Sequence, residues 1–327
     1  TDILVAGGNT VSGILGMSVP NVNDGVVDNK GIEIALNTRL IQTKDFSWDL
    51  NLNFSKNQNK VKELVDGVDM FELEKASWLD VQVAAKVGEN YGSIIGPDFQ
   101  RNENGDILID PSTGLPMYDK SSHILGNASW DWTGGLVTTL AYKNLSLSAV
   151  FDVKVGADLY SMSARSAYES GKALETLQGR EEWYRSEEQR KAAGFPKGSP
   201  DWKPTGGFIA PGVIDNGDGT YRPNDIYINP EDYWMSVCRN APSMFIYDNS
   251  YVKCRELTLT YQFPKKLLKN VVDNLTISFV ARNPFIVYKN IPNIDPDSNY
   301  NNTTGMGLEY GSLPSRKSYG FNVNIKF

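Results

Sequence analysis

The amino-acid sequence predicts an all-β chain whose antiparallel strands form part of a membrane-crossing barrel. Three observations favour this fold class. Apolar and polar residues alternate one by one in several segments, and short and long connections alternate between those segments. There is no run of about 18 apolar residues, the length that a transmembrane helix requires. Strands are therefore the expected membrane-crossing elements.

The last ten residues, 318–327, carry the clearest alternation. Odd-numbered positions from Tyr319 to Phe327 are aromatic or branched apolar, and even-numbered positions from Ser318 to Lys326 are small or polar. Successive side chains of a strand point to opposite faces, so this segment has one apolar and one polar face. Its length fits the roughly 9–11 residues of a tilted transmembrane strand. The segment is predicted to be the closing strand of a barrel.

The same period of two recurs along the chain. It is unbroken in residues 46–55, where Phe46, Trp48, Leu50, Leu52 and Phe54 share one face. Further strands are predicted at 32–40, 136–142, 145–155, 257–263 and 275–279, and a weaker one at 3–5. The chain is therefore expected to contribute about eight strands.

The connections between these segments are of two unequal kinds. The short ones are 42–45, 143–144 and 264–274, and the long ones are about 12–28, 57–131, 159–248 and 289–316. If the last strand runs towards the periplasm, every short turn is periplasmic and every long loop is extracellular, as in outer-membrane barrels. Residues 57–131 and 159–248 are then large extracellular loops within a single unit, 1–327.

Eight strands leave two architectures open. They can close a small barrel, or they can form part of a larger one whose remaining strands lie elsewhere, because an open sheet would leave unpaired edges in hydrocarbon. The N-terminal residues do not resemble a signal peptide, so we expect the chain to be the C-terminal part of a longer precursor. One edge of residues 318–327 is then unpaired. Pairing with the segment near Ile3 would instead indicate the small closed barrel.

The long loops have predicted structure of their own. Strand-like pieces at 81–87 and 107–109, with a turn at Asn104-Gly105-Asp106, predict a hairpin. Residues 164–193 have helical propensity, with Gly171 and Gly179 as breaks, and residues 195–232 are expected to be irregular.

Composition and motifs limit the function. The net charge of -7 argues against a general nucleic-acid partner. The single histidine, His123, has no nucleophile motif beside it, and no motif of a metalloprotease, hydrolase or nucleotide-binding enzyme is present. The chain is therefore not expected to be an enzyme or to hold a cofactor. Cys238 and Cys254 fit a disulfide or two free thiols equally well.

A metal site is also not expected. Residues 215–220 (Asp-Asn-Gly-Asp-Gly-Thr) offer Asp215 and Asp218 as a weak calcium candidate. The segment lacks the alternation and the distal glutamate of an EF-hand loop, so an ordinary Asx-Gly turn is the favoured interpretation.

Several short sequence motifs, spread over nearly the whole chain, are typical of one family. They are Asn-Lys-Gly-Ile-Glu-Ile at 29–34, Asp-Trp-Thr-Gly-Gly at 131–135, Phe-Pro-Lys-Lys-Leu-Leu at 263–268, Asp-Pro-Asp at 295–297 and Pro-Ser-Arg-Lys-Ser-Tyr-Gly at 314–320. Together they resemble the C-terminal barrel of SusC/RagA-type TonB-dependent transporters of Bacteroidetes outer membranes. Two features depart from that pattern. The plug and the TonB-contacting segment are absent from this chain, and Pro284 stands where the family has leucine, although proline cannot donate to a strand ladder.

The resemblance implies a location and a set of partners. It implies a plugged barrel of about 22 strands in the cell outer membrane, in contact with its lipid. It further implies TonB as the energy source, acting through the missing N-terminal part, and a SusD-like surface lipoprotein as a lid. The barrel-assembly machinery would read the terminal aromatic Phe327, and the transporter–lid complex would form a homodimer. The implied function is import of nutrient oligomers, oligosaccharides first and oligopeptides second.

An alternative function from another class stays open. The chain would then be a non-transporting surface module, either a small closed outer-membrane barrel that displays its loops or a soluble glycan-binding β-domain. Folding without detergent distinguishes the soluble module from a membrane protein.

Two groups of residues are candidates for function. The first group consists of aromatic residues of the 159–248 loop: Trp183, Tyr184, Trp202, Tyr233 and Trp234. Their rings would stack on sugars, or else they would pack the loop against itself or against the lid protein. The second group consists of charged residues at polar-face positions, which would face the lumen: Glu33, Arg39, Asp49, Asp152, Lys154 and Arg282. They would be solvated or form ion pairs with the plug, or else they would contact the passing substrate.

Overall fold

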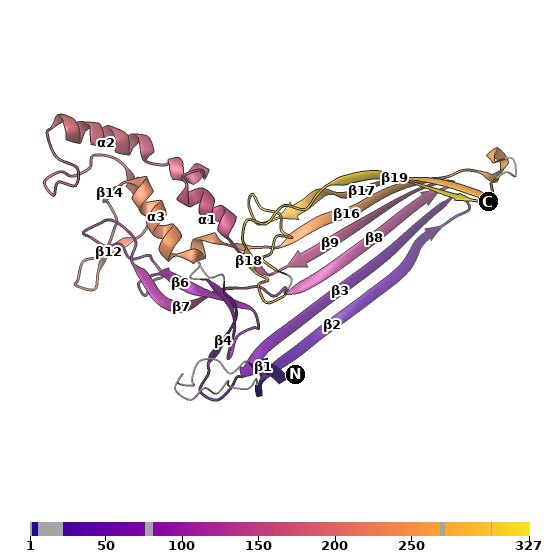
Figure 1. The fold of residues 1–327 in the computed structure, drawn as a ribbon, viewed down its shortest axis with the longest axis horizontal. Coiled ribbons are helices and arrows are strands. Elements are labelled where there is room, and N and C mark those ends of the chain that lie inside the picture. Colours follow the sequence, from indigo (N-terminus) through magenta and orange to yellow (C-terminus); the bar gives the residue numbers. More distant parts are fainter. Residues whose placement is uncertain (1, 6–21, 76–80, 269–271, 302) are drawn as a thin grey trace, which may run out of the picture.

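A computed structural model describes residues 2–5, 22–75, 81–268, 272–301 and 303–327. Its main feature is an eight-stranded sheet of long strands (Figure 1). In spatial order the strands are β1 (Asp2–Val5), β2 (Val22–Gln42), β3 (Phe46–Glu63), β8 (Trp132–Tyr142), β9 (Leu145–Val155), β16 (Tyr251–Gln262), β17 (Asn274–Lys289) and β19 (Ser318–Lys326).

The sheet is open, with every neighbour antiparallel and in chain order. Each strand predicted from the alternation is present. Within the described part of the chain, β19 pairs with β17 alone, and β1 lies at the opposite edge against the first residues of β2. The predicted unpaired edge of the last strand is therefore confirmed, and the pairing that would indicate a small closed barrel is not observed.

Short and long connections lie at opposite ends of the strands, as predicted. The turns β2–β3, β8–β9 and β16–β17 are at the end where β19 finishes, and the long connections are at the other end (Figure 1). The β8–β9 turn has two residues, and Lys143 adopts a left-handed conformation there (φ 54°). β2 and β3 pair from Gln42↔Ser47 out to Val26↔Glu63, well beyond their predicted ends.

The long connection between β3 and β8 forms a four-stranded sheet rather than a single hairpin. Its strands are β4 (Met70–Lys75), β5 (Gln82–Lys86), β6 (Ser93–Phe99) and β7 (Tyr118–Asn127). The turn predicted at Gly105 exists and is closed by an Arg101↔Ile107 bridge. The segment predicted as its partner strand, now β5, pairs instead with β4 and β6.

The long connection between β9 and β16 contains the helices. They are α1 (Met162–Glu169), α2 (Arg180–Ala192) and α3 (Pro230–Asn240), with 3-10 turns η1 (Leu174–Leu177) and η2 (Pro242–Phe245); a third, η3 (Lys265–Leu267), lies between β16 and β17. Gly171 and Gly179 have positive φ and interrupt the helical region as predicted. Helix α3 was not predicted, although its Asn229 cap accepts a hydrogen bond from the Glu231 N–H at 3.1 Å and proline follows the cap.

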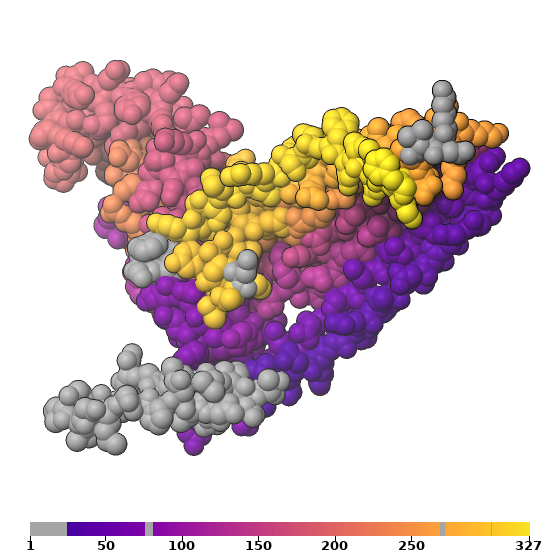
Figure 2. Space-filling model, turned by 45° about the vertical axis from the view of Figure 1, so that its right-hand side comes forward, coloured from indigo at the N-terminus to yellow at the C-terminus, as the bar shows by residue number. Residues whose placement is uncertain are grey.

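Short strands complete the loop region. β10 (Asp158–Ser161) lies between β15 (Ile246–Asp248) and β18 (Leu308–Glu309), and β11 (Phe208–Ile209), β12 (Val213–Asp215), β13 (Tyr221–Pro223) and β14 (Tyr227–Ile228) form two small pairs. Figure 2 shows the part of the chain that holds α1, α2 and α3 as a lobe, coloured pink to orange, beyond one end of the long strands. The region between 195 and 232 is thus mostly irregular, as expected.

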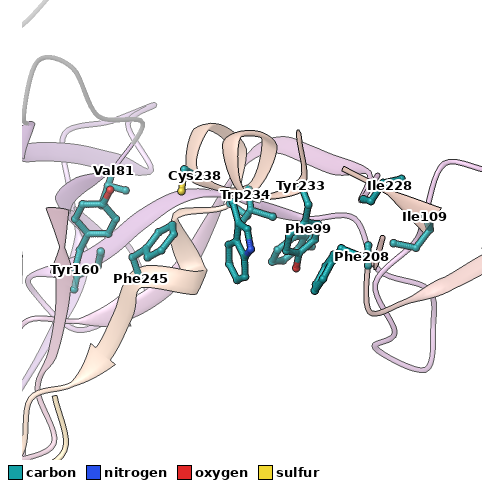
Figure 3. Packing of buried hydrophobic residues seen from close by; sticks show 14 of the residues in the cluster. Val81, Phe99, Ile109, Tyr160, Phe208, Ile228, Tyr233, Trp234, Cys238 and Phe245 are labelled. Carbon is teal, nitrogen blue, oxygen red and sulfur yellow. The ribbon is translucent and has the colours of Figure 1, made fainter. Parts of the chain in front are cut away.

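The largest core of buried residues lies in this loop region and not in the long sheet. It gathers aromatic and aliphatic side chains from β6, β10, β11, α3 and η2, including Phe99, Tyr160, Phe208, Trp234 and Phe245 (Figure 3). The long sheet, by contrast, leaves many large apolar side chains open: Phe321 is 78% exposed and Ile34 is 57% exposed. Among the described residues, no helix is long and apolar enough to span a membrane.

Candidate functional site

The strand register separates the long sheet into an apolar and a polar face. Phe321, Phe279 and Leu259 are direct neighbours across β19, β17 and β16, and the apolar side chains of β9, β8, β3 and β2 continue the row. All six charged residues predicted for the lumen fall on the opposite, polar face: Glu33, Arg39, Asp49, Asp152, Lys154 and Arg282.

The structure brings some of these six into contact and separates others. Arg39 and Asp49 form an ion pair with 2.6 Å between Nε and Oδ1, and Arg282 pairs with Glu256 at 3.2 Å. Both pairs are largely exposed, so each contributes only about 0–1 kcal/mol. Together they give the polar face charges of both signs.

A denser ionic cluster lies where the polar face meets the last loop. It consists of Asp152, Lys253, Arg255, Asp295 and Asp297. Lys253 is 1% exposed, and its Nζ lies 3.1 Å from Asp295 Oδ1 and 2.6 Å from Asp297 Oδ2. Arg255 donates to both carboxylate oxygens of Asp297 and also pairs with Asp152.

A bulge in β16 makes this cluster possible. The register passes from Cys254 to Glu256 on both neighbouring strands, so Arg255 has no partner residue and turns onto the polar face. The same irregularity accommodates Pro284 on β17, because the register there passes from Arg282 to Phe285. Alternation alone did not reveal Lys253 and Arg255 as functional candidates, because the bulge breaks the period of two.

The aspartates of the loop are held ionised by the two cations. Burial alone would raise the pKa of Asp297, but hydrogen bonds and charge from Arg255 and Lys253 lower it below its usual range. Burial is likewise outweighed at Asp295, whose pKa is lowered by hydrogen bonds from Ser315, Lys253 and the Asp297 backbone. Asp295 and Asp297 therefore anchor the last loop to the long sheet by charge.

Three of the five aromatic candidates surround one cavity. Trp183, Tyr184 and Trp234 line a space of about 220 Å³ together with Tyr168, Arg180 and Glu231, and we call it the helical cavity because α1, α2 and the start of α3 enclose it. Tyr184 is 67% exposed, whereas Trp234 is 8% exposed and its ring lies tilted against that of Tyr168, with 4.7 Å between ring centroids.

The other two aromatic candidates lie apart from this cavity. Tyr233 is buried in the core against Phe208, with 4.5 Å between ring centroids, and burial raises its pKa to about 12. Trp202 packs on Phe195 at 5.7 Å. These contacts are those expected when aromatics pack a loop against itself.

The remaining polar candidates make local contacts. Asp215 accepts a hydrogen bond from the Gly217 N–H, and Asp218 accepts from Thr220, as in Asx turns. His123 contacts Asp119 and Ser121 through the same nitrogen, Nε2, whereas a catalytic relay requires both ring nitrogens. Cys238 and Cys254 are both buried free thiols.

Comparison with known proteins identifies relatives of one kind, although no family model matches the chain. TonB-dependent receptor P3 of Formosa agariphila is 24% identical, over 95% of this chain and 30% of the receptor. Receptor P26 of the same organism is 25% identical over 93% of this chain, and TonB-dependent receptor SusC of Bacteroides thetaiotaomicron is 21% identical over 93%. The chain spans about 30% of the length of these curated relatives.

Solved structures share the fold. The RagAB peptide importer in its closed-closed state superposes with a TM-score of 0.62 at 18% identity, over 97% of this chain and 31% of the importer chain. Its open-open state gives a TM-score of 0.63 at 19% identity, over 100% of this chain and 31% of the other. The long sheet therefore has the fold of a TonB-dependent receptor barrel.

Proposed function

We propose that this homologue of TonB-dependent receptors is the C-terminal part of an outer-membrane transporter that imports nutrient oligomers. The observation that carries the proposal is the two-faced open sheet. Its apolar face exposes residues such as Phe321 and Ile34 over successive strands, and such an extended apolar surface is typical of membrane contact. Its polar face carries charges of both signs and suits a wet lumen.

The unpaired edge of β19 supports a larger barrel. In hydrocarbon, each unpaired backbone group costs several kcal/mol, so a spanning sheet must close. β19 has partners on one side only among the described residues. We propose that further strands of the native transporter complete the ladder. The native transporter would also contain the plug.

Oligosaccharides are the proposed substrate class, with oligopeptides as the main rival. The helical cavity offers the rings of Trp183, Tyr184 and Trp234 beside the carboxylate of Glu231, a combination that suits stacking and hydroxyl recognition. The guanidinium of Arg180 is already engaged by Gly171 and Thr176 and serves to shape the wall. Peptides stay the rival substrate class because the RagAB structures are described as those of a peptide importer.

The proposed partners follow the same family. A SusD-like lipoprotein would cover the extracellular loops, and TonB would supply energy through a segment outside this chain. Outer-membrane lipid would surround the apolar face, and the assembly machinery would recognise the C-terminal strand. A dimer of the transporter–lid complex belongs to the same proposal, which rests on the similarity to SusC and RagAB proteins.

Uptake by cells tests this function. A strain lacking the full-length gene should lose growth on particular glycans, and the wild-type gene should restore growth only when TonB is active. A Trp183→Ala, Tyr184→Ala double variant should reduce uptake without reducing the amount of protein in the membrane. Tyr227→Ala is the matched control, because Tyr227 is 38% exposed in the same loop and does not line the cavity.

Two results would reject the proposal. Normal growth of the deletion strain on every glycan and peptide tested would exclude import. Folding of the purified chain as a monomer in buffer without detergent would favour the soluble surface module instead.

A further inference from the structure

The apolar face of the long sheet ends in lysines where β2 and β3 approach the long connections. The two strands keep an unbroken register from Arg39↔Asp49 to Val27↔Val61, so residues two apart stay on one face. Ile34 and Phe54 form one apolar row, and in the next row Ile32 faces Lys56. Further along the same face the side chains are charged or amide: Asp28, Lys30, Gln58 and Lys60.

These side chains surround a pocket of about 300 Å³, which we call the basic pocket. Its lining consists of three lysines, one carboxylate and three amides: Lys30, Lys60, Lys62, Asp28, Gln58, Asn59 and Asn90. The carboxylate is already paired, because Lys62 Nζ lies 3.7 Å from Asp28 Oδ2. Lys30, Lys60 and the adjacent Lys56 have no ion-pair partner among the described residues. The excess of ammonium groups therefore favours an anionic ligand.

An apolar groove of about 440 Å³ lies in the same face, over β2, β3, β8 and β9. Gly134 on β8 stands between Phe54 on β3 and Val153 on β9, so the apolar row lacks a side chain there. Apart from Asn53 and two glycines, the described residues of the lining are apolar. A glycine inside a strand often marks a place where a ligand approaches the backbone closely. The groove suits a hydrocarbon chain.

The groove and the lysines lie at the heights expected of the two parts of one lipid. Phe54 lines the groove, and Lys56 and Gln58 follow on the same face at roughly 7 and 13 Å along the strand. Trp132 lines the groove beside Phe54, with 5.6 Å between ring centroids, and tryptophan is typical of the boundary between hydrocarbon and headgroups. The lysines therefore begin where a headgroup would begin.

The position on the outside of the sheet selects the source of the anion. A soluble acidic ligand or an acidic surface of a partner protein would satisfy the lysines, but neither would fill an apolar groove beside them. An anionic lipid satisfies both, and clusters of lysine next to a membrane-spanning segment are typical of binding to such lipids.

We infer that the outer face of β2, β3 and β8 binds one anionic lipid of the outer leaflet, with a phosphate group on the lysines of the basic pocket and Lys56, and with an acyl chain in the groove over Gly134. The inference rests on the proposed function, because it requires the apolar face to lie in the outer membrane with the long connections outward.

Native mass spectrometry of the full-length transporter with its lid protein, in a neutral detergent, tests the headgroup contact. The probe is lipid A from the same membrane, compared with lipid A whose phosphates have been removed. Each lysine near an anionic lipid surface contributes about a factor of five, so the triple variant Lys30→Gln, Lys56→Gln, Lys60→Gln should bind lipid A about 100-fold more weakly. All three side chains are exposed, so the fold should be kept.

A second triple variant controls for the change in charge. Lys44→Gln, Lys265→Gln and Lys266→Gln remove the same number of charges from exposed positions in the short turns, at the other end of the sheet. This variant should bind lipid A as the wild type does.

A pair of variants tests the groove. Leu52→Trp places a larger side chain in the lining and should weaken binding of lipid A several-fold. Leu147→Trp is the matched control, because Leu147 is 43% exposed on the apolar face of β9, against 39% for Leu52 on β3, and does not line the groove. Inorganic phosphate, a headgroup without a chain, should not displace lipid A.

The outcomes separate this inference from the proposed function. Equal binding of lipid A with and without its phosphates, or unchanged binding in the Lys30, Lys56 and Lys60 variant, overturns the inference. Displacement of lipid A by inorganic phosphate, or equal affinities of Leu52→Trp and wild type, overturns it as well and assigns the lysines to a phosphate group alone. Normal TonB-dependent uptake beside either result leaves import standing. Lysine-dependent and groove-dependent binding in a protein without such uptake upholds the inference and rejects import.

Discussion

Replacing Lys253 by methionine should release residues 290–316 from the polar face of the sheet. Lys253 Nζ reaches Asp295, Asp297 and Ser315 Oγ, and the lysine side chain is 2% exposed against 7% for Asp295. Methionine keeps most of the length of the side chain but removes the charge and all of its donors. Asp295 is then left buried beside Asp297 with no cation of its own.

The magnitude follows from the burial. Removing one partner of a buried ion pair costs about 3–5 kcal/mol, because the remaining charge stays uncompensated. Arg255 still neutralises Asp297, so the loss is concentrated on Asp295. At 1.4 kcal/mol for each factor of ten, local opening of the loop should become about 100-fold to several thousand-fold more frequent.

Hydrogen exchange measures this opening directly. The backbone N–H of Ser315 donates to Asp295 Oδ2 at 2.8 Å, so its exchange rate reports on the cluster. Lys154→Met is the control, because Lys154 contacts the Trp130 ring, a kind of contact that contributes about 0.5–1 kcal/mol at exposed sites. Equal exchange rates at Ser315 in wild type and Lys253→Met would refute the proposed anchor.

Three further predictions concern the loops. Because the pKa values of Asp295 and Asp297 are lowered in the folded protein, their contribution to stability is complete at pH 7 and is lost as the pH falls below about 4. Pepsin should therefore cut residues 290–316 faster at pH 2 than at pH 4 after each rate is divided by the rate on an unfolded peptide of the same sequence, which removes the pH dependence of pepsin itself; equal normalised rates would contradict this. Burial raises the pKa of Cys238 to about 12, so iodoacetamide at pH 8 should leave this thiol unmodified until the protein is denatured. Gly179→Ala should destabilise the helical region by about 1–3 kcal/mol more than Gly194→Ala in thermal unfolding, since both glycines have φ of 79° but only at Gly179 would a Cβ meet backbone, 2.7 Å away.

The long sheet was predictable from the sequence because a single local rule determines it. In a membrane barrel one face of each strand contacts lipid and the other contacts water. The alternation with a period of two is therefore visible in each strand alone, whatever its neighbouring strands are. Residues 318–327 gave nearly the whole of β19 for this reason, and residues 46–55 gave the first part of β3. The polar-face positions of Asp49 and Asp152 followed from the same pattern.

The clusters that the sequence did not reveal depend on contacts between distant segments. Lys253 and Asp295 are 42 residues apart and meet through a bulge that alternation obscures. The helical cavity combines residues from separate helices, so the spacing of Trp183 and Trp234 along the chain did not indicate that they line one space. Helix α3 did carry a local signal, Asn229-Pro230-Glu231-Asp232, which is the pattern of a capped helix start.

Site-directed labelling of β19 in the native outer membrane tests the central claim most directly. Phe321 and Asn322 are adjacent in sequence and lie on opposite faces of the strand, facing Phe279 and Ser278 on β17. If the apolar face contacts lipid and the polar face lines a wet lumen, a cysteine at 322 should react with a water-soluble maleimide and a cysteine at 321 should not. Equal labelling of both positions by that reagent would contradict the account.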